Sequence, residues 1–195
     1  MQFNTPKRSI PVPLRNMASG CCHWKCVLLF QCPTITFFGL TVRRAMKLVE
    51  LLDDSTVELD LKGRSKYEVI AELLDLLVAA GKVKDRDRAL QDLIEREGYL
   101  STGLERGLAV PHAKTPAVEE LVLAFGLSRE GVDFESNDGK PAHFIFLLLS
   151  PVNTSGPHIK ALAQITRNFS DPKIGSRLLE ARSKQEVLDI LSTFQ

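Results

Sequence analysis

Apolar side chains recur with two different periods after the first 45 residues. Residues 56–61 (TVELDL) place them at every second position, which is typical of a half-buried strand. Residues 65–81 place them three and four positions apart, which is typical of a helix. Ser65 and Glu68 form the S-x-x-E pattern of a capping box before this stripe, and Gly81 follows it as a stop signal. The pattern therefore predicts a strand followed by a helix.

The remaining elements follow from the same two periods. A second helix is predicted at 85–97, with Leu93 and Ile94 on its buried face and Gly98 at its end. The nearly continuous apolar run at 143–149 (HFIFLLL) predicts a central strand that is buried on both faces. Further strands and helices are predicted at residues 121–127, 132–134, 158–169, 173–181 and from 183 onward.

The order of these elements is helices, then strands, then helices. It predicts an α/β fold in which a mixed β-sheet is sandwiched between helical layers, as a single domain over 46–195. In this arrangement the helix at 158–169 is expected to bury Ile159 and Ile165. Residues 1–45 show neither period, and we expect them to be an N-terminal extension that is disordered or results from a mis-assigned start.

The extension differs from the domain in charge and in cysteine content. Residues 1–45 hold six basic and no acidic side chains, so the domain keeps 19 of the 25 basic and all 24 acidic ones, a net charge of −5. An acidic domain lacks the basic face that nucleic acid requires. All four cysteines lie in the extension, so the domain can form no disulfide and needs no oxidising compartment.

Two alternatives for the extension stay open. A zinc site is suggested by the cluster Cys21, Cys22, His23, Cys26 and Cys32. The second pair of ligands that a structural zinc site usually has is missing, however. The uncharged run 26–42 is shorter than the ~20 apolar residues of a spanning helix, and no clean cleavage site of a signal peptide follows it. We therefore expect a cytoplasmic protein with no membrane insertion of the domain.

Candidate chemistry centres on residues 107–115 (GLAVPHAKT). An apolar strand is predicted to end at Pro111, because proline has no N–H and fixes φ, and His112 follows at the strand end. Imidazole is the side chain most easily tuned to be a neutral nucleophile near neutral pH. A Pro-His pair at a strand end is also common in ordinary surface structure, so a functional His112 needs partners from elsewhere in the chain.

Three other segments supply candidate partners for His112. They are the end of the second helix, a small polar loop and the start of a later helix, with residues Arg96, Ser101, Thr102, Gly103 and His158. Each alone has an ordinary interpretation, namely a helix-end charge, a turn or a surface residue. His143 opens a strand without an obvious partner, and we expect no role for it.

This combination resembles the IIA domain of the mannitol/fructose type (EIIA type 2) in the bacterial phosphoenolpyruvate-dependent sugar phosphotransferase system (PTS). That family carries an E-R-E helix end, then S-T-G, then G-[apolar]-A-[apolar]-P-H, and later a helix that opens with histidine. The matching segments here are residues 95–97, 101–103, 107–112 and 157–158. Arg96 and His112 are 16 positions apart, and His112 and His158 are 46 apart, which fits the family pattern. The resemblance covers residues 46–195.

The resemblance implies that His112 accepts a phosphoryl group from a small histidine-phosphorylated carrier protein (HPr-like), and that Arg96 and His158 line the same site. Phosphoryl transfer passes through a loose transition state, so catalysis consists of positioning and charge stabilisation. An arginine fork suits phosphate oxygens. Further binding of the phosphate is expected from the small polar loop, Ser101, Thr102 and Gly103. No metal or other cofactor is expected, because a phosphohistidine donor is already activated.

Three functions remain to be separated. We favour a nitrogen-regulatory IIA protein that signals to regulatory protein targets, because no membrane, carrier-protein or other module is recognisable in the sequence. The alternative is a fructose- or mannitol-specific IIA subunit that passes phosphate to a sugar-transporting IIB/IIC partner. Either protein would be a phosphotransferase component. The third is a metal site or a hydrolase, but no HExxH motif, GxSxG motif or paired carboxylate lies near these histidines.

Overall fold

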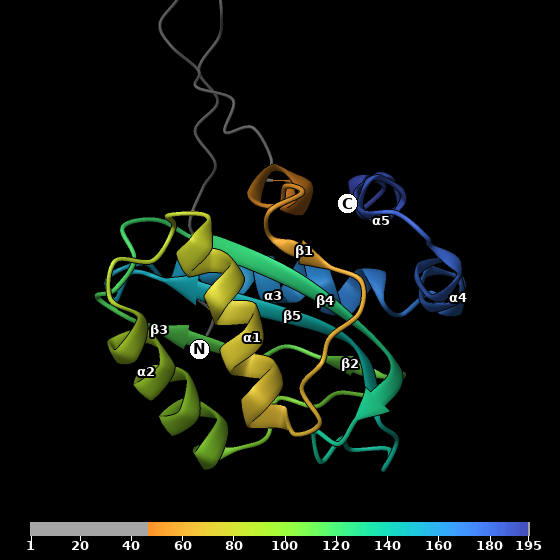
Figure 1. Ribbon diagram of the computed structural model, residues 1–195, viewed down its shortest axis with the longest axis horizontal. Helices are drawn as coiled ribbons and strands as arrows, with labels where there is room; N and C mark the ends of the chain where they lie inside the picture. Colours follow the sequence, from red (N-terminus) through yellow and green to blue (C-terminus); the bar gives the residue numbers. More distant parts are fainter. Residues whose placement is uncertain (1–46, 195) are drawn as a thin grey trace, which may run out of the picture. The chain divides into compact units, whose positions relative to one another are not determined.

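The computed structural model describes residues 47–194. These residues form one mixed five-stranded sheet with helices on both faces, which confirms the predicted α/β sandwich (Figure 1). The strands are β1 (Val57–Glu58), β2 (Leu108–Ala109), β3 (His112–Lys114), β4 (Val122–Val132) and β5 (Ala142–Ser150). The helices are η1 (Leu48–Leu51), α1 (Lys66–Ala79), α2 (Arg86–Tyr99), α3 (Gly156–Asn168), α4 (Pro172–Glu180) and α5 (Lys184–Ser192).

The sheet is built around the long antiparallel pair β4 and β5. β1 runs parallel to β4 on its outer side, and both β2 and β3 run parallel to β5 on the other side. α1 and α2 cover one face of the sheet and α3 lies behind it (Figure 1). Alternate residues of β5 therefore belong to two different hydrophobic cores, with Phe144, Phe146 and Leu148 on one side and Ile145, Leu147 and Leu149 on the other. This confirms that β5 is a central strand buried on both faces.

The predicted start and stop signals of α1 are confirmed. The Ser65 side chain accepts a hydrogen bond from the Glu68 N–H, and the Glu68 carboxylate accepts from the Ser65 N–H, which closes the capping box. Gly81 has a φ of +70°, a left-handed conformation that costs least for glycine. No helix within residues 47–194 is long and apolar enough to cross a membrane.

Two predicted boundaries are wrong for local reasons. The strand expected at 56–61 is only the two residues of β1, because the Glu58 carboxylate accepts the N–H groups of Leu59 and Asp60 and turns the chain out of the ladder. α2 does not end before Gly98 but continues through it to Tyr99. Glycine costs a helix about 1 kcal/mol relative to alanine, which is not enough to end it here.

Two predicted inward side chains point outward instead. Ile94 on α2 is 41% exposed and Ile159 on α3 is 63% exposed. On α3 the residue before it, His158, is buried together with Ala161 and Ile165. The prediction for Ile165 is therefore confirmed and the one for Ile159 is wrong, because His158 is the buried residue in the first turn of the helix.

The expectations for the extension fall on residues 1–46, which lie outside the described residues, as does Gln195. They include the cluster of cysteines with His23, the uncharged run 26–42 and the mis-assigned start. They stay expectations, and the site described below is built entirely from residues 47–194.

Candidate functional site

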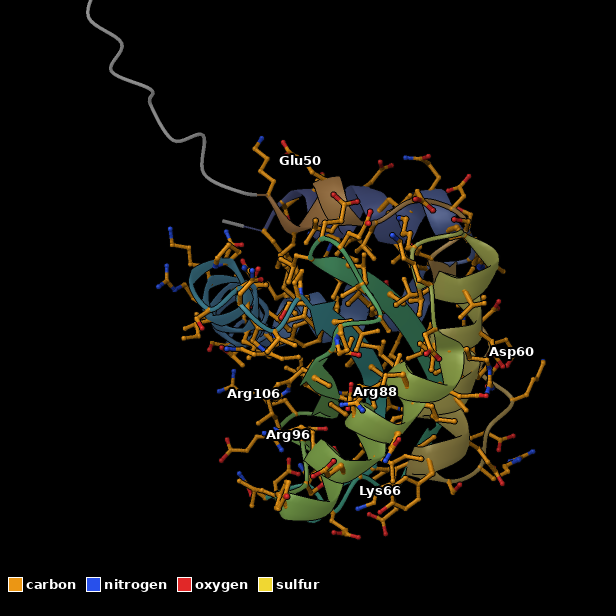
Figure 2. The ribbon with its side chains drawn as sticks, turned by 90° about the vertical axis from the view of Figure 1, so that its left-hand side faces the viewer. Glu50, Asp60, Lys66, Arg88, Arg96 and Arg106 are labelled. Carbon is orange, nitrogen blue, oxygen red and sulfur yellow. The ribbon has the colours of Figure 1, made fainter. Side chains whose placement is uncertain are left out.

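A pocket of about 400 Å³ lies where α2, β3 and the start of α3 meet. It is lined by Asp92, Glu95, Arg96, Tyr99, His112, Ala113, Lys114 and His158. Three predicted site residues that are far apart in the sequence, Arg96, His112 and His158, therefore share one cavity. Arg96 extends from the end of α2 (Figure 2). Within residues 47–194 no group of three or more histidine, cysteine, aspartate or glutamate side chains is arranged to hold a metal ion.

His112 is the first residue of β3, where it pairs with Leu148 of β5. The predicted strand before it does end ahead of Pro111, but a new strand begins directly at His112, so the backbone of His112 is paired within the sheet rather than lying beyond a strand end. Its Nδ1 lies 2.7 Å from the carbonyl oxygen of Val110. A carbonyl can only accept, so Nδ1 carries the proton and Nε2 of the neutral ring holds a free lone pair.

The surroundings keep His112 neutral. Burial lowers the pKa of its imidazole below the ordinary value, and the nearby Arg96 guanidinium acts in the same direction. The hydrogen bond to the Val110 carbonyl and the Glu97 carboxylate act in the opposite direction. Since the net pKa is lowered, the ring is uncharged at neutral pH, which is the form that can act as a nucleophile.

His158 faces His112 across the pocket. The two ring centres are 5.4 Å apart with an interplanar angle of 62°. His158 is 5% exposed, and its Nδ1 lies 2.7 Å from the hydroxyl oxygen of Ser150 at the end of β5. Burial above all, with added repulsion from His112, Lys114 and Arg96, lowers the pKa of His158 to about 4. Two neutral imidazoles thus lie side by side among cationic groups.

The lowered pKa of His158 makes stability depend on pH. The ordinary pKa of 6.5 applies to the unfolded chain and about 4 to the folded protein, so stability is lost as the pH falls below 6.5. At about pH 5 this ring alone lowers the free energy of unfolding by about 2 kcal/mol relative to pH 8. Urea unfolding of the protein and of a His158→Gln variant at both pH values checks this, because the variant loses that part of the pH dependence. Equal pH dependence in the two proteins would contradict it.

Cationic groups in the pocket are available for an anion. Arg96 Nη1 donates to the Leu100 carbonyl at 2.9 Å, which holds the guanidinium at the helix end and leaves its other N–H groups open. Asp92 lines the same pocket, but its carboxylate is paired with Arg88 at 3.0 Å. Lys114 donates to the Ser155 hydroxyl at 2.8 Å, ahead of α3. The pocket therefore holds two cations that no pocket carboxylate neutralises within residues 47–194.

The small polar loop lies elsewhere. Ser101, Thr102 and Gly103 are not among the residues that line the pocket. Both oxygens of the Glu97 carboxylate accept from Thr102, and the Ser101 hydroxyl contacts the same carboxylate and the Phe134 carbonyl. The loop thus lies behind the pocket, where it surrounds a buried acid, instead of facing a ligand.

Glu97 was noted in the sequence only as part of the E-R-E motif and was given no role, although the sequence holds a signal for its burial. It follows Ala89 and Leu93 at intervals of four residues, and all three lie on the buried face of α2. A glutamate that continues an apolar helical stripe needs buried hydrogen-bond partners, and the two hydroxyl residues that follow supply them.

Gly103 has a packing role that its residue type explains. A Cβ at this position would lie 2.4 Å from the Phe134 carbonyl oxygen and 2.8 Å from the Ser136 Oγ. A Gly103→Ala variant is therefore expected to lower the free energy of unfolding by about 1–3 kcal/mol, because backbone atoms must move apart. Urea unfolding measures this, and a matched Gly156→Ala variant, whose Cβ would meet nothing within 4 Å, controls for the loss of a glycine. A Gly103→Ala protein no less stable than the control would contradict the close contact.

A second cavity, of about 540 Å³, lies beside the start of β5. His143 lines it, and its Nδ1 donates to the Ser128 carbonyl at 2.9 Å. Arg106 donates to backbone carbonyls at the end of α3, and Asp171 caps α4. These three polar side chains are thus occupied in holding the fold, and Arg96, His112 and His158 do not line this cavity.

Most of this chain matches one protein family. Residues 50–193 match the family described as "Phosphoenolpyruvate-dependent sugar phosphotransferase system, EIIA 2". A fructose-specific EIIA component of Haloferax volcanii is 43% identical over 136 residues, which are 70% of this chain and 88% of that protein. A fructose-specific EIIABC component of Bacillus subtilis is 38% identical over 147 residues, or 75% of this chain, and the match spans only 23% of that longer protein.

Solved structures share the fold. The nitrogen regulatory protein IIA-Ntr of Neisseria meningitidis is 35% identical with a TM-score of 0.69, over 73% of this chain and 97% of that one. The mannitol enzyme IIA of Escherichia coli, determined in complex with phosphorylated mannitol enzyme IIB, is 26% identical with a TM-score of 0.63, over 72% of this chain and 96% of that one.

The mixed sheet between two helical layers is therefore that of the phosphotransferase-system IIA proteins. The chain belongs to the EIIA 2 family of this system, which confirms the resemblance inferred from the motifs. As a member it is a phosphotransfer component of the phosphoenolpyruvate-dependent sugar phosphotransferase system.

Proposed function

We propose that the chain is a cytoplasmic phosphocarrier that takes a phosphoryl group onto Nε2 of His112 from a histidine-phosphorylated carrier protein. The observation that carries this is the hydrogen bond of 2.7 Å between Nδ1 and the Val110 carbonyl. It reserves Nε2 as the nucleophile in a ring that is neutral at physiological pH. Family membership supports the reaction class.

The transfer balances without a metal or an added base. The lone pair on His112 Nε2 forms the new N–P bond while the N–P bond of the donor breaks, and its electron pair returns to the donor imidazole. The Nδ1 proton stays on His112, directed at Val110. The phosphorylated ring therefore carries a positive charge, which makes it a good leaving group for the next transfer.

The pocket cations take up the charge of the phosphoryl group. Its three equatorial oxygens carry most of the negative charge in a loose transition state. The Arg96 fork can donate to two of these oxygens, and Lys114 supplies a second positive charge from β3. His158 can donate from Nε2 when its Nδ1 accepts from the Ser150 hydroxyl.

Protein partners are proposed to dock around the pocket. Six large apolar side chains are exposed within residues 47–194. Five of them lie either on α2 and the residue after it or on the stretch from the end of β5 into α3, and both segments contribute residues to the pocket: Ile94, Tyr99, Leu100, Val152 and Ile159. Exposed apolar residues of this kind mark interaction sites. Tyr99 itself lines the pocket, and these side chains are proposed to contact the HPr-like donor and then the downstream partner.

For the downstream partner, we favour regulatory protein targets whose binding depends on whether His112 is phosphorylated, as in a nitrogen-regulatory IIA protein. The second candidate is a IIB subunit of a fructose- or mannitol-type transporter, which the 43% identical fructose-specific component favours. Incubating the phosphorylated protein with a purified fructose- or mannitol-type IIB domain separates the two. Rapid loss of label from His112 to the IIB domain favours the transporter role, and stable label favours the regulatory role.

The test of the phosphocarrier function is direct. Purified protein is mixed with phosphoenolpyruvate, the general phosphotransferase enzyme and its small histidine carrier, and the modified residue is mapped by mass spectrometry under alkaline conditions. We expect one acid-labile phosphate on His112. A protein that takes up no phosphate, or takes it up only at another residue, would overturn the proposal.

A further inference from the structure

The buried carboxylate of Glu97 is a feature that the proposed transfer does not use directly. Within residues 47–194 it is the only aspartate, glutamate, lysine or arginine that is buried, with 2% of its surface exposed. Burial of an ionised carboxylate is costly unless hydrogen bonds and a counter-charge compensate it. The groups around Glu97 must therefore compensate the cost of its burial.

Glu97 has a full set of partners. The Thr102 N–H donates to Oε1 at 3.1 Å and the Thr102 hydroxyl donates to Oε2 at 2.6 Å. The Ser101 hydroxyl lies 3.1 Å from Oε1, and its single proton is shared between this oxygen and the Phe134 carbonyl. The ammonium of Lys66 on α1, labelled in Figure 2, lies 3.9 Å from Oε1. Thr102 is thus held at two points by one carboxylate.

Thr102 is connected in turn to the phosphoryl acceptor. Its carbonyl accepts a hydrogen bond of 3.1 Å from the Val110 N–H. The Val110 carbonyl then accepts the 2.7 Å bond from His112 Nδ1. Pro111 follows Val110 and has a fixed φ, so the peptide that carries this carbonyl has little freedom of its own. Glu97 is therefore connected to His112 through hydrogen bonds that pass by way of Thr102 and Val110.

We propose that Glu97 is a positioning residue that, through Thr102 and Val110, holds His112 in the tautomer with Nε2 free. The inference rests on the proposed phosphocarrier function and adds to it the device that keeps the nucleophile ready. A free histidine side chain prefers its proton on Nε2, where it would block phosphoryl uptake. The Val110 carbonyl imposes the other tautomer, and it can do so only while it stays in line with Nδ1.

The same arrangement explains the small polar loop. Ser101 and Thr102 were expected to hold phosphate oxygens, and their hydroxyls are instead directed at Glu97. Gly103 admits the close approach of the Phe134 carbonyl beside them. The loop thus acts on the phosphoryl group only through the orientation of His112.

Paired variants of Thr102 test the proposal. Thr102→Val keeps the shape of the side chain and removes the hydroxyl, whereas Thr102→Ser keeps the hydroxyl. We expect the valine variant to be phosphorylated on His112 about ten-fold or more slowly, and the serine variant to recover most of the rate. A Glu97→Gln variant, which keeps the size of the side chain and removes its charge, is expected to be slowed as well. Asp87→Asn, which removes a largely exposed acid from the start of the same helix, is the control and should keep the original rate.

A spectroscopic readout separates positioning from simple loss of stability. In ¹⁵N-labelled unphosphorylated protein, the His112 ring should show an unprotonated Nε2 at pH 7.5, and Thr102→Val should shift it toward the protonated form. Serine at 102 should restore the original signal. Folded Thr102→Val and Glu97→Gln proteins with unchanged tautomer and unchanged rate would overturn the proposal. Because the tautomer is measured without phosphate, failure of His112 to be phosphorylated at all would count against the phosphocarrier function and not against this one.

Discussion

Replacement of His112 by glutamine is expected to remove phosphoryl uptake and leave the domain folded. Glutamine is close to histidine in size and uncharged, but it offers no nitrogen lone pair for a new N–P bond. We expect the rate of phosphate incorporation to fall at least about a thousand-fold, as is usual when a nucleophile is lost. Incorporation of label from phosphoenolpyruvate through the carrier protein measures this, with thermal unfolding as the check on folding.

The matched control is His158→Gln, because the two imidazoles are neighbours with ring centres 5.4 Å apart. This variant keeps the nucleophile and should still be labelled, more slowly, on His112. Label that persists in the His112→Gln protein and maps to His158 would contradict the assignment of the acceptor. If both variants are folded and neither is labelled, the assignment of His112 as the acceptor and His158 as a supporting residue would be contradicted.

The sequence predicts the layers of this fold well, since each rests on many side chains. The seven residues HFIFLLL could only be a strand buried on both faces or a buried helix, and their length and flanking residues favour the strand. The buried residue in the first turn of α3 is less predictable. The choice between Ile159 and His158 as the inward residue depends on Ser150, which offers His158 Nδ1 a buried partner at 2.7 Å. That contact joins residues eight positions apart, and it forms only once the segment between β5 and α3 has its folded conformation.

The sequence predicts which residues meet in the pocket better than it predicts the residues that support them. His112, Arg96 and His158 belong to motifs, and the fold brings them into one pocket. Ser101 and Thr102 look like phosphate ligands because hydroxyl groups suit phosphate, but the sequence does not reveal which acceptor they face. A buried carboxylate only four or five residues away competes for the same protons, and Glu97 holds them in the fold.

Removal of the Arg96 side chain is the second large effect that we expect. Arg96→Ala takes away a preorganised donor for the phosphoryl oxygens, which typically costs about a hundred- to a thousand-fold in rate. Arg96→Lys keeps the charge but not the planar fork, so it should recover only part of the loss. Stability should change little, by about 1 kcal/mol, because the side chain makes one hydrogen bond to the Leu100 carbonyl. Single-turnover labelling and urea unfolding measure the two quantities.

The pH profile distinguishes this role from a general disturbance of α2. The Arg96 charge lowers the pKa values of both His112 and His158. Without it both pKa values rise, so the pH below which phosphoryl uptake declines should move upward in Arg96→Ala and return toward the original in Arg96→Lys. Arg86→Ala, which removes a partly exposed arginine that begins α2 and pairs with Asp75 of α1, should leave rate and profile unchanged. A slowed Arg96→Ala protein with an unshifted profile would mean that the guanidinium does not face the two rings, and the charge in the site would have to come from Lys114 alone.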